Sequence, residues 1–110
     1  MEHPPIWRHQ LTKDAGVCTI ALAGELDLAC SATLQGLLIE QAQAAGVADL
    51  RVDLAEVGFL DSTVLGVLIS AMHYATEQGR GFSVVAPSPA GQRILAITGL
   101  DTVLAGTDER

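Results

Sequence analysis

The chain has 110 residues, about the size of one ordinary domain, which excludes a multidomain machine. Hydrophobic residues make up 49% of the sequence, enough for a sizeable core, so intrinsic disorder is excluded as well. Six basic residues against thirteen acidic ones give a net charge of −7. A nucleic-acid surface built on clustered Lys and Arg is therefore not expected, and a partner attracted by charge would be basic.

The sequence predicts no membrane insertion, no cofactor and no metal site. No stretch reaches the roughly 18 consecutive apolar residues of a membrane span, and the first ten residues lack a signal-peptide pattern, so we expect a cytoplasmic protein. Cys18 and Cys30 are separated by a spacing that matches no metal motif, and the three histidines are scattered. We expect both thiols to pack as small apolar side chains.

The first half of the chain predicts two strands followed by a helix. Residues 6–12 alternate weakly, whereas residues 17–23 alternate clearly and are expected to end at Gly24. Ser31 is a suitable N-cap for a helix that runs to Ala45 and is followed by a glycine.

The middle of the chain predicts a strand and a second helix. Residues 50–54 alternate as a strand does, and residues 55–60 are expected to be irregular or extended. The second helix is expected to begin at Asp61-Ser62 and to end at Gly79, because its apolar residues recur with helical spacing.

The last part predicts a short strand over 82–85 and a third helix that Ser88-Pro89 opens and Gly99 ends. Residues 103–104 would add an edge strand or a packing segment. Strands separated by helices favour parallel pairing through right-handed crossovers, with the opening pair as a hairpin. We therefore expect one α/β domain over residues 1–110, a small mixed, mostly parallel sheet of four to five strands with about three to four helices.

The segment Asp61-Ser62-Thr63 is the first candidate site. A helix N-terminus has unpaired backbone N–H groups that can accept an anion or a phosphoryl group, and a hydroxyl there is accessible. Ordinary capping by Asp61 or Ser62 is the competing interpretation.

The same helix carries a second apolar stripe formed by Val64, Val67 and Ala71, with Tyr74. This stripe widens the apolar arc to roughly 200°, more than a helix on a sheet needs. Either a neighbouring helix covers it, or it is a docking surface.

Seven acids lie around the preceding strand and turn, with only Arg51 to offset them: Glu25, Asp27, Glu40, Asp49, Asp53, Glu56 and Asp61.

Three motifs resemble those of the STAS domain, and more narrowly those of the bacterial anti-sigma factor antagonists. They are GELD at 24–27, DLAEVGFLDSTVLGVL at 53–68 and TGLD at 98–101, in the order and at the spacings of the family. The resemblance covers essentially the whole chain and implies a small mixed sheet packed against helices.

The resemblance also implies a function. Such proteins are not enzymes: they bind an anti-sigma factor that is also a serine kinase, and so free a sigma factor. The kinase phosphorylates the serine after the motif's aspartate, here Ser62, which breaks the complex, and a PP2C-type phosphatase restores it. The expected partner-binding residues are Glu25, Asp27, Asp61, Thr63, Val64, Val67 and Ala71.

Val64 stands where the family usually has a small residue, and we expect its side chain to lie at the rim that a kinase approaches. This favours one alternative, a cytoplasmic STAS subunit of a membrane transporter ATPase, including lipid transporters, which is not phosphorylated. A remote alternative is a small serine hydrolase that uses Ser62. It lacks a G-x-S-x-G motif, and His73 is eleven residues further along the same helix.

Overall fold

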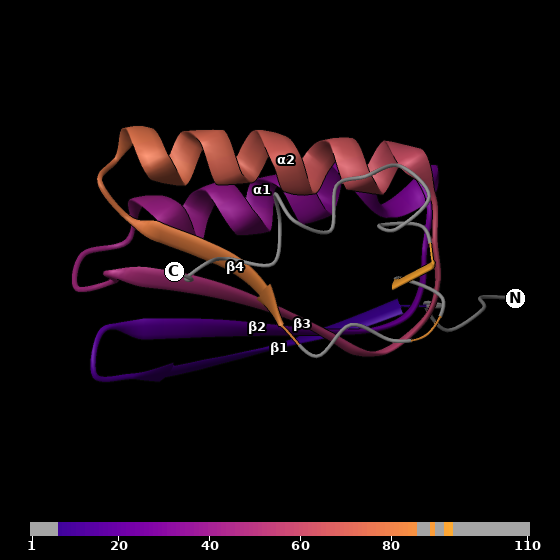
Figure 1. The fold of residues 1–110 in the computed structure, drawn as a ribbon, viewed down its shortest axis with the longest axis horizontal. Coiled ribbons are helices and arrows are strands. Elements are labelled where there is room, and N and C mark those ends of the chain that lie inside the picture. The colour runs from indigo at the N-terminus through magenta and orange to yellow at the C-terminus, as the bar shows by residue number, and fades with distance from the viewer. Residues whose placement is uncertain (1–6, 86–88, 90–91, 94–110) are drawn as a thin grey trace, which may run out of the picture.

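The structure, a computed structural model, describes residues 7–85, 89 and 92–93. In this part the chain forms four strands and two helices: β1 (Trp7–Asp14), β2 (Val17–Leu26), α1 (Leu28–Gln43), β3 (Asp49–Leu60), α2 (Ser62–Glu77) and β4 (Gly81–Val85) (Figure 1). The expected third helix over 89–99 lies mostly outside the described residues, as does the segment 103–104.

The four strands form one mixed sheet in the order β1-β2-β3-β4. β1 pairs with β2 in an antiparallel hairpin, and β3 is parallel to both β2 and β4. The expectation of a mixed, mostly parallel sheet with an opening hairpin is confirmed. Each parallel connection contains a helix, as crossovers in such sheets require.

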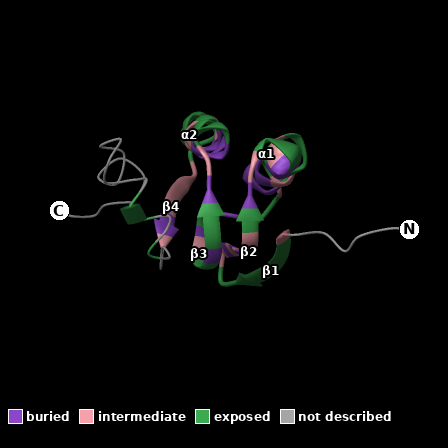
Figure 2. Ribbon diagram, turned by 90° about the vertical axis from the view of Figure 1, so that its right-hand side faces the viewer, coloured by how far each residue is buried: buried purple, intermediate pink, exposed green. Residues whose placement is uncertain are grey.

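Both described helices pack on the same face of the sheet, as Figure 2 shows. Alternating residues of the two central strands face them and are buried. These residues are Cys18, Ile20 and Leu22 on β2 and Leu50, Val52 and Leu54 on β3. Leu34 and Leu38 of α1 and Leu68 of α2 complete the core from the helix side. No helix in the described residues is both long and apolar enough to cross a membrane.

Two strands extend beyond the expected ends. β2 continues through Gly24 to Leu26, because Gly24 has a φ of 97° and the register between β2 and β3 shifts beside it. Glycine adopts this backbone conformation without a Cβ penalty, so the strand bends there and does not stop. β3 likewise continues through 55–60, which we expected to be irregular or extended.

The start of α1 also differs from the expectation. The helix begins at Leu28 and its N-cap is Asp27, whose Oδ1 accepts a hydrogen bond from the N–H of Ala29 at 2.9 Å. Ser31 lies inside the first turn, where its hydroxyl donates to the carbonyl oxygen of Leu28 at 2.9 Å. Asp and Ser are both strong N-caps, so composition alone does not choose between them.

Candidate functional site

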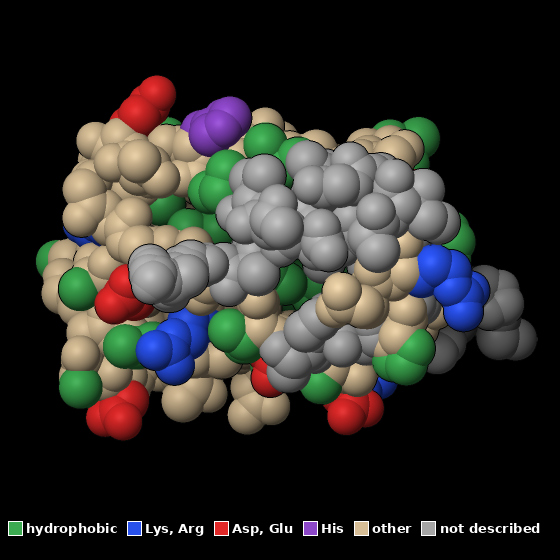
Figure 3. Space-filling model, viewed as in Figure 1, with side chains coloured by type: hydrophobic (Ala, Val, Ile, Leu, Met, Phe, Trp, Pro, Cys, Tyr) green, Lys and Arg blue, Asp and Glu red, His purple; other side chains and the backbone are tan. Residues whose placement is uncertain are grey.

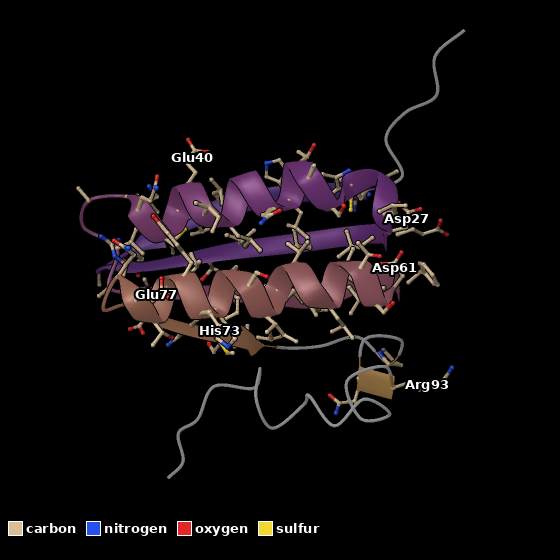
Figure 4. The ribbon with its side chains drawn as sticks, turned by 90° about the horizontal axis from the view of Figure 1, so that it is seen from above. Asp27, Glu40, Asp61, His73, Glu77 and Arg93 are labelled. Carbon is tan, nitrogen blue, oxygen red and sulfur yellow. The ribbon has the colours of Figure 1, made fainter. Side chains whose placement is uncertain are left out.

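The parallel pairing of β2 and β3 brings the starts of both helices to the same end of the molecule. Leu26 and Leu60, the last residues of the two strands, are register partners. The N–H of Asp61 donates to the carbonyl oxygen of Leu26 at 3.2 Å, which ties the second strand-to-helix turn to the first. Figure 4 shows Asp27 and Asp61 together at this end.

The Asp61 carboxylate joins the two helices. Its Oδ1 accepts a hydrogen bond from the N–H of Val64 at 3.0 Å, which caps α2. Its Oδ2 accepts a hydrogen bond from the N–H of Leu28, the first residue of α1, at 3.1 Å. Capping by Asp61 is therefore confirmed, and one side chain fixes the relative position of both helix starts.

Ser62 and Thr63 are the first two residues of α2, and both are exposed. Because Asp61 serves as the cap, the Ser62 hydroxyl is not required for that role. It lies at the positive end of the helix dipole with access from solvent, so an added phosphoryl group could be accommodated there without disturbing the core. Phosphorylation itself stays a prediction.

Three of the seven acidic residues named from the sequence lie at the end of the molecule where both helices start. Glu25 is exposed and is the next-to-last residue of β2, and Asp27 and Asp61 are half-buried beside the helix starts. Glu40 and Glu77 lie toward the other end of the helices in Figure 4. On the face seen in Figure 3, the described Lys and Arg side chains are scattered and form no continuous patch.

The prediction that Val64, Val67 and Ala71 form an exposed docking stripe on α2 is wrong. Val64 and Ala71 are 0% exposed and Val67 is 9% exposed. The reason is that α1 packs alongside α2, so this side of α2 belongs to the core. The side chain of Val64 consequently does not lie at the rim of the site. Tyr74 is half-buried, and its hydroxyl accepts a hydrogen bond from Nε2 of Gln43 on α1 at 2.8 Å.

Two exposed apolar residues at this end were missed by the sequence reasoning. Leu28 is 68% exposed at the start of α1, and Phe59 is 47% exposed near the end of β3. A longer third strand would have revealed Phe59, because Leu60 faces the core and its neighbour must face outward. The exposure of Leu28 was not predicted, because the helix was expected to start at Ser31, after this residue.

The described part of the site contains hydroxyls and carboxylates, and no histidine of α2 lies beside Ser62. His73 is eleven residues from Ser62 on the same helix, about 16 Å by helical rise. Among the residues that the structure describes, no three His, Cys, Asp or Glu side chains are placed to hold a metal ion. Cys30 belongs to the first turn of α1 and is buried, and burial raises the pKa of its thiol. Cys18 is also buried, as expected for both cysteines.

Comparisons with known proteins agree with this geometry. Residues 9–105 match the family described as "Mlab, STAS domain". The anti-sigma-B factor antagonist of Bacillus subtilis (strain 168) is 32% identical over 85 residues, which are 77% of this chain and 76% of that protein.

Two solved proteins have the same fold. An anti-sigma factor antagonist from Mycobacterium paratuberculosis is 28% identical with a TM-score of 0.79, over 97% of this chain and 92% of that one. The anti-sigma factor antagonist SpoIIAA in its unphosphorylated form is 18% identical with a TM-score of 0.77, over 94% and 90%. The chain therefore belongs to the STAS domain family, and the proteins it matches there include anti-sigma factor antagonists, which are regulators and not enzymes.

Proposed function

We propose that this protein is an anti-sigma factor antagonist controlled by phosphorylation of Ser62. In its unmodified form it binds an anti-sigma factor that is also a serine kinase, and a sigma factor is released. The observation that carries the proposal is the position of Ser62. Its exposed hydroxyl directly follows Asp61, the residue that holds the two helix starts together.

The charges around Ser62 explain how a phosphate would act as a switch. A phosphoserine adds about −1.5 to −2 charge, and Glu25, Asp27 and Asp61 are already at this end of the molecule. The helix N-terminus offsets part of the added charge, by about 0.3–1 kcal/mol at an exposed site. A partner that covers the phosphate without a counter-ion loses several kcal/mol of binding free energy. The fold therefore tolerates the modification, and the complex does not.

The relatives support this interpretation. SpoIIAA has also been solved in its phosphorylated form, with a TM-score of 0.66 to this chain at 19% identity, over 94% of this chain and 93% of that one. The proposed cycle needs a PP2C-type phosphatase to remove the phosphate and make the protein competent to bind again. All of these steps would take place in the cytoplasm, where sigma factors act.

The alternative of a transporter ATPase subunit is not tested by the structure, but it loses the support that Val64 gave it. Val64 favoured this alternative because its side chain was expected at the rim that a kinase approaches, and that side chain is 0% exposed. A kinase approaching Ser62 therefore does not meet it.

Kinase assays test the proposed function. Each anti-sigma factor kinase of the source organism is purified, incubated with this protein and ATP, and the product is followed by intact mass. One kinase is expected to add a single phosphate, to do so on Ser62, and to leave Ser62→Ala unmodified. Thr63→Ala removes the neighbouring exposed hydroxyl, that of an expected partner-binding residue, so its rate of modification can fall, but the single phosphate should still be added to Ser62. Absence of phosphate with every kinase would contradict the proposal and favour the transporter alternative.

A further inference from the structure

The exposed large apolar side chains are concentrated at the Ser62 end of the molecule. Among the described residues, three such side chains are exposed. Two of them adjoin Asp61: Leu28 donates its N–H to the Asp61 carboxylate, and Phe59 precedes Asp61 by two residues. The third, Leu11, is on the edge strand β1 and is 37% exposed.

Packing among the described residues does not account for Leu28 and Phe59. Neither belongs to the buried core cluster or to the partly buried residues packed against it. Phe59 is the register partner of Glu25, so an apolar ring and a carboxylate come from adjacent strands. Apolar side chains left in water beside charged ones are typical of the centre and rim of a protein interface.

Gly66 gives an independent indication that something approaches α2 from outside. It is exposed and follows Ser62 by four residues, which places both on the same helix face. A Cβ at Gly66 would meet no atom of the described residues within 4 Å. Glycine inside a helix is less stable than alanine, and the contacts within this described part of the chain do not require it. The missing side chain leaves room for close approach by another molecule.

We infer that Leu28 and Phe59 are the apolar anchors for the anti-sigma factor kinase, which passes closely over Gly66. This inference rests on the proposed function and specifies its partner surface: an apolar pocket bordered by Lys and Arg. The basic border follows from the carboxylates of Glu25 and Asp27 beside the anchors and from the net charge of −7.

The arrangement also explains the sensitivity of the complex to Ser62. Ser62 directly follows Asp61 and shares a helix face with Gly66, so a partner seated on both anchors and on Gly66 would exclude water from the Ser62 hydroxyl. Apolar anchors at the centre of an interface are where most of the binding free energy is located. A phosphate introduced there is desolvated, whereas the same charge at the rim would be screened by solvent.

Anchor substitutions test the inference with the purified kinase that modifies Ser62. Leu28→Ala and Phe59→Ala should each raise the dissociation constant by about tenfold or more. Leu11→Ala removes a comparable exposed apolar side chain from β1 and should change the constant by less than about twofold. Wild-type affinity in both anchor variants would overturn the inference.

Two matched glycine substitutions distinguish a loss of partner binding from a loss of fold stability. Gly36 in α1 is exposed, and a Cβ added there, as at Gly66, would meet none of the atoms that the structure describes within 4 Å. Gly66→Ala and Gly36→Ala should both raise the melting temperature, but only Gly66→Ala should weaken the kinase complex, by about tenfold. Equal affinity in the two variants would refute close approach over Gly66.

The results also distinguish this inference from the proposed function. If a kinase binds and phosphorylates the wild-type protein while Leu28→Ala, Phe59→Ala and Gly66→Ala bind it normally, only the inference fails. If no kinase binds or modifies the wild-type protein, the proposed function fails and the inference fails with it.

Discussion

The Asp61 carboxylate accepts a hydrogen bond from the N–H of Leu28, a residue 33 positions earlier in the chain, at 3.1 Å. Its other oxygen caps α2 through the N–H of Val64. The side chain next to the candidate phosphorylation site is therefore also the link between the two helix starts. It thereby holds the starts of both helices beside the ends of β2 and β3.

Removal of the Asp61 carboxylate should destabilise the protein more than removal of the Asp27 carboxylate. Asp61→Ala leaves two helix N–H groups without their partner, and we expect a loss of about 2 kcal/mol in the free energy of unfolding. Asp27→Ala loses one cap, that of Ala29, and should cost about 1 kcal/mol. Urea unfolding of both variants measures the difference. Equal losses would contradict the bridging role of Asp61.

A negative charge at Ser62 should leave the fold intact. Ser62→Asp places a carboxylate at the exposed N-terminus of α2, where the helix dipole offsets its charge. We expect the melting temperature to change by less than about 5 °C. A loss of many degrees in a thermal melt would mean that the charge acts through the fold and not through the interface.

Truncation of Val64 should reduce stability but not partner binding. The side chain is 0% exposed in the core, and Val64→Ala should cost about 1.5–3 kcal/mol through lost burial and the cavity it leaves. Affinity for the kinase, measured at a temperature where the variant is folded, should equal that of the wild type. If Val64→Ala had normal stability but weak binding, this prediction would be wrong and Val64 would belong to the docking surface.

The buried cysteines predict a loss of stability at alkaline pH. Burial raises the pKa of the Cys18 and Cys30 thiols, so the unfolded chain releases these protons at a lower pH than the folded one. The stabilisation is fully present below the unfolded pKa of about 8.5 and is lost as the pH rises through the folded values.

Urea unfolding at about pH 7 and about pH 9.5 checks this prediction, with Cys18→Ala/Cys30→Ala as the comparison. The wild type should lose more stability between these two pH values than the double variant does. Identical losses in the two proteins would show that the thiols do not contribute.

Much of the architecture could be predicted because the relevant signals are local. Alternation over 17–23 and 50–54 identified the two central strands, and helical spacing after Asp61 identified α2, although the sequence left its cap open between Asp61 and Ser62. The opening hairpin and the parallel crossovers followed from the order of the elements.

The surface of the site could not be predicted in the same way, because it depends on tertiary packing. The wide apolar arc of α2 required a cover on its second side, but only the structure shows that α1 supplies it and buries Val64 and Ala71. Exposure of Leu28 depended on the choice of Asp27 over Ser31 as the N-cap, and local sequence does not make that choice.

The central claim is that one phosphate on Ser62 decides whether the partner binds. The most direct test is the dissociation constant of the purified kinase for the unmodified protein and for the protein fully phosphorylated on Ser62. We expect the phosphorylated form to bind at least about thirtyfold more weakly, since an unpaired buried charge costs about 2 kcal/mol or more. Equal dissociation constants for the two forms would contradict the account.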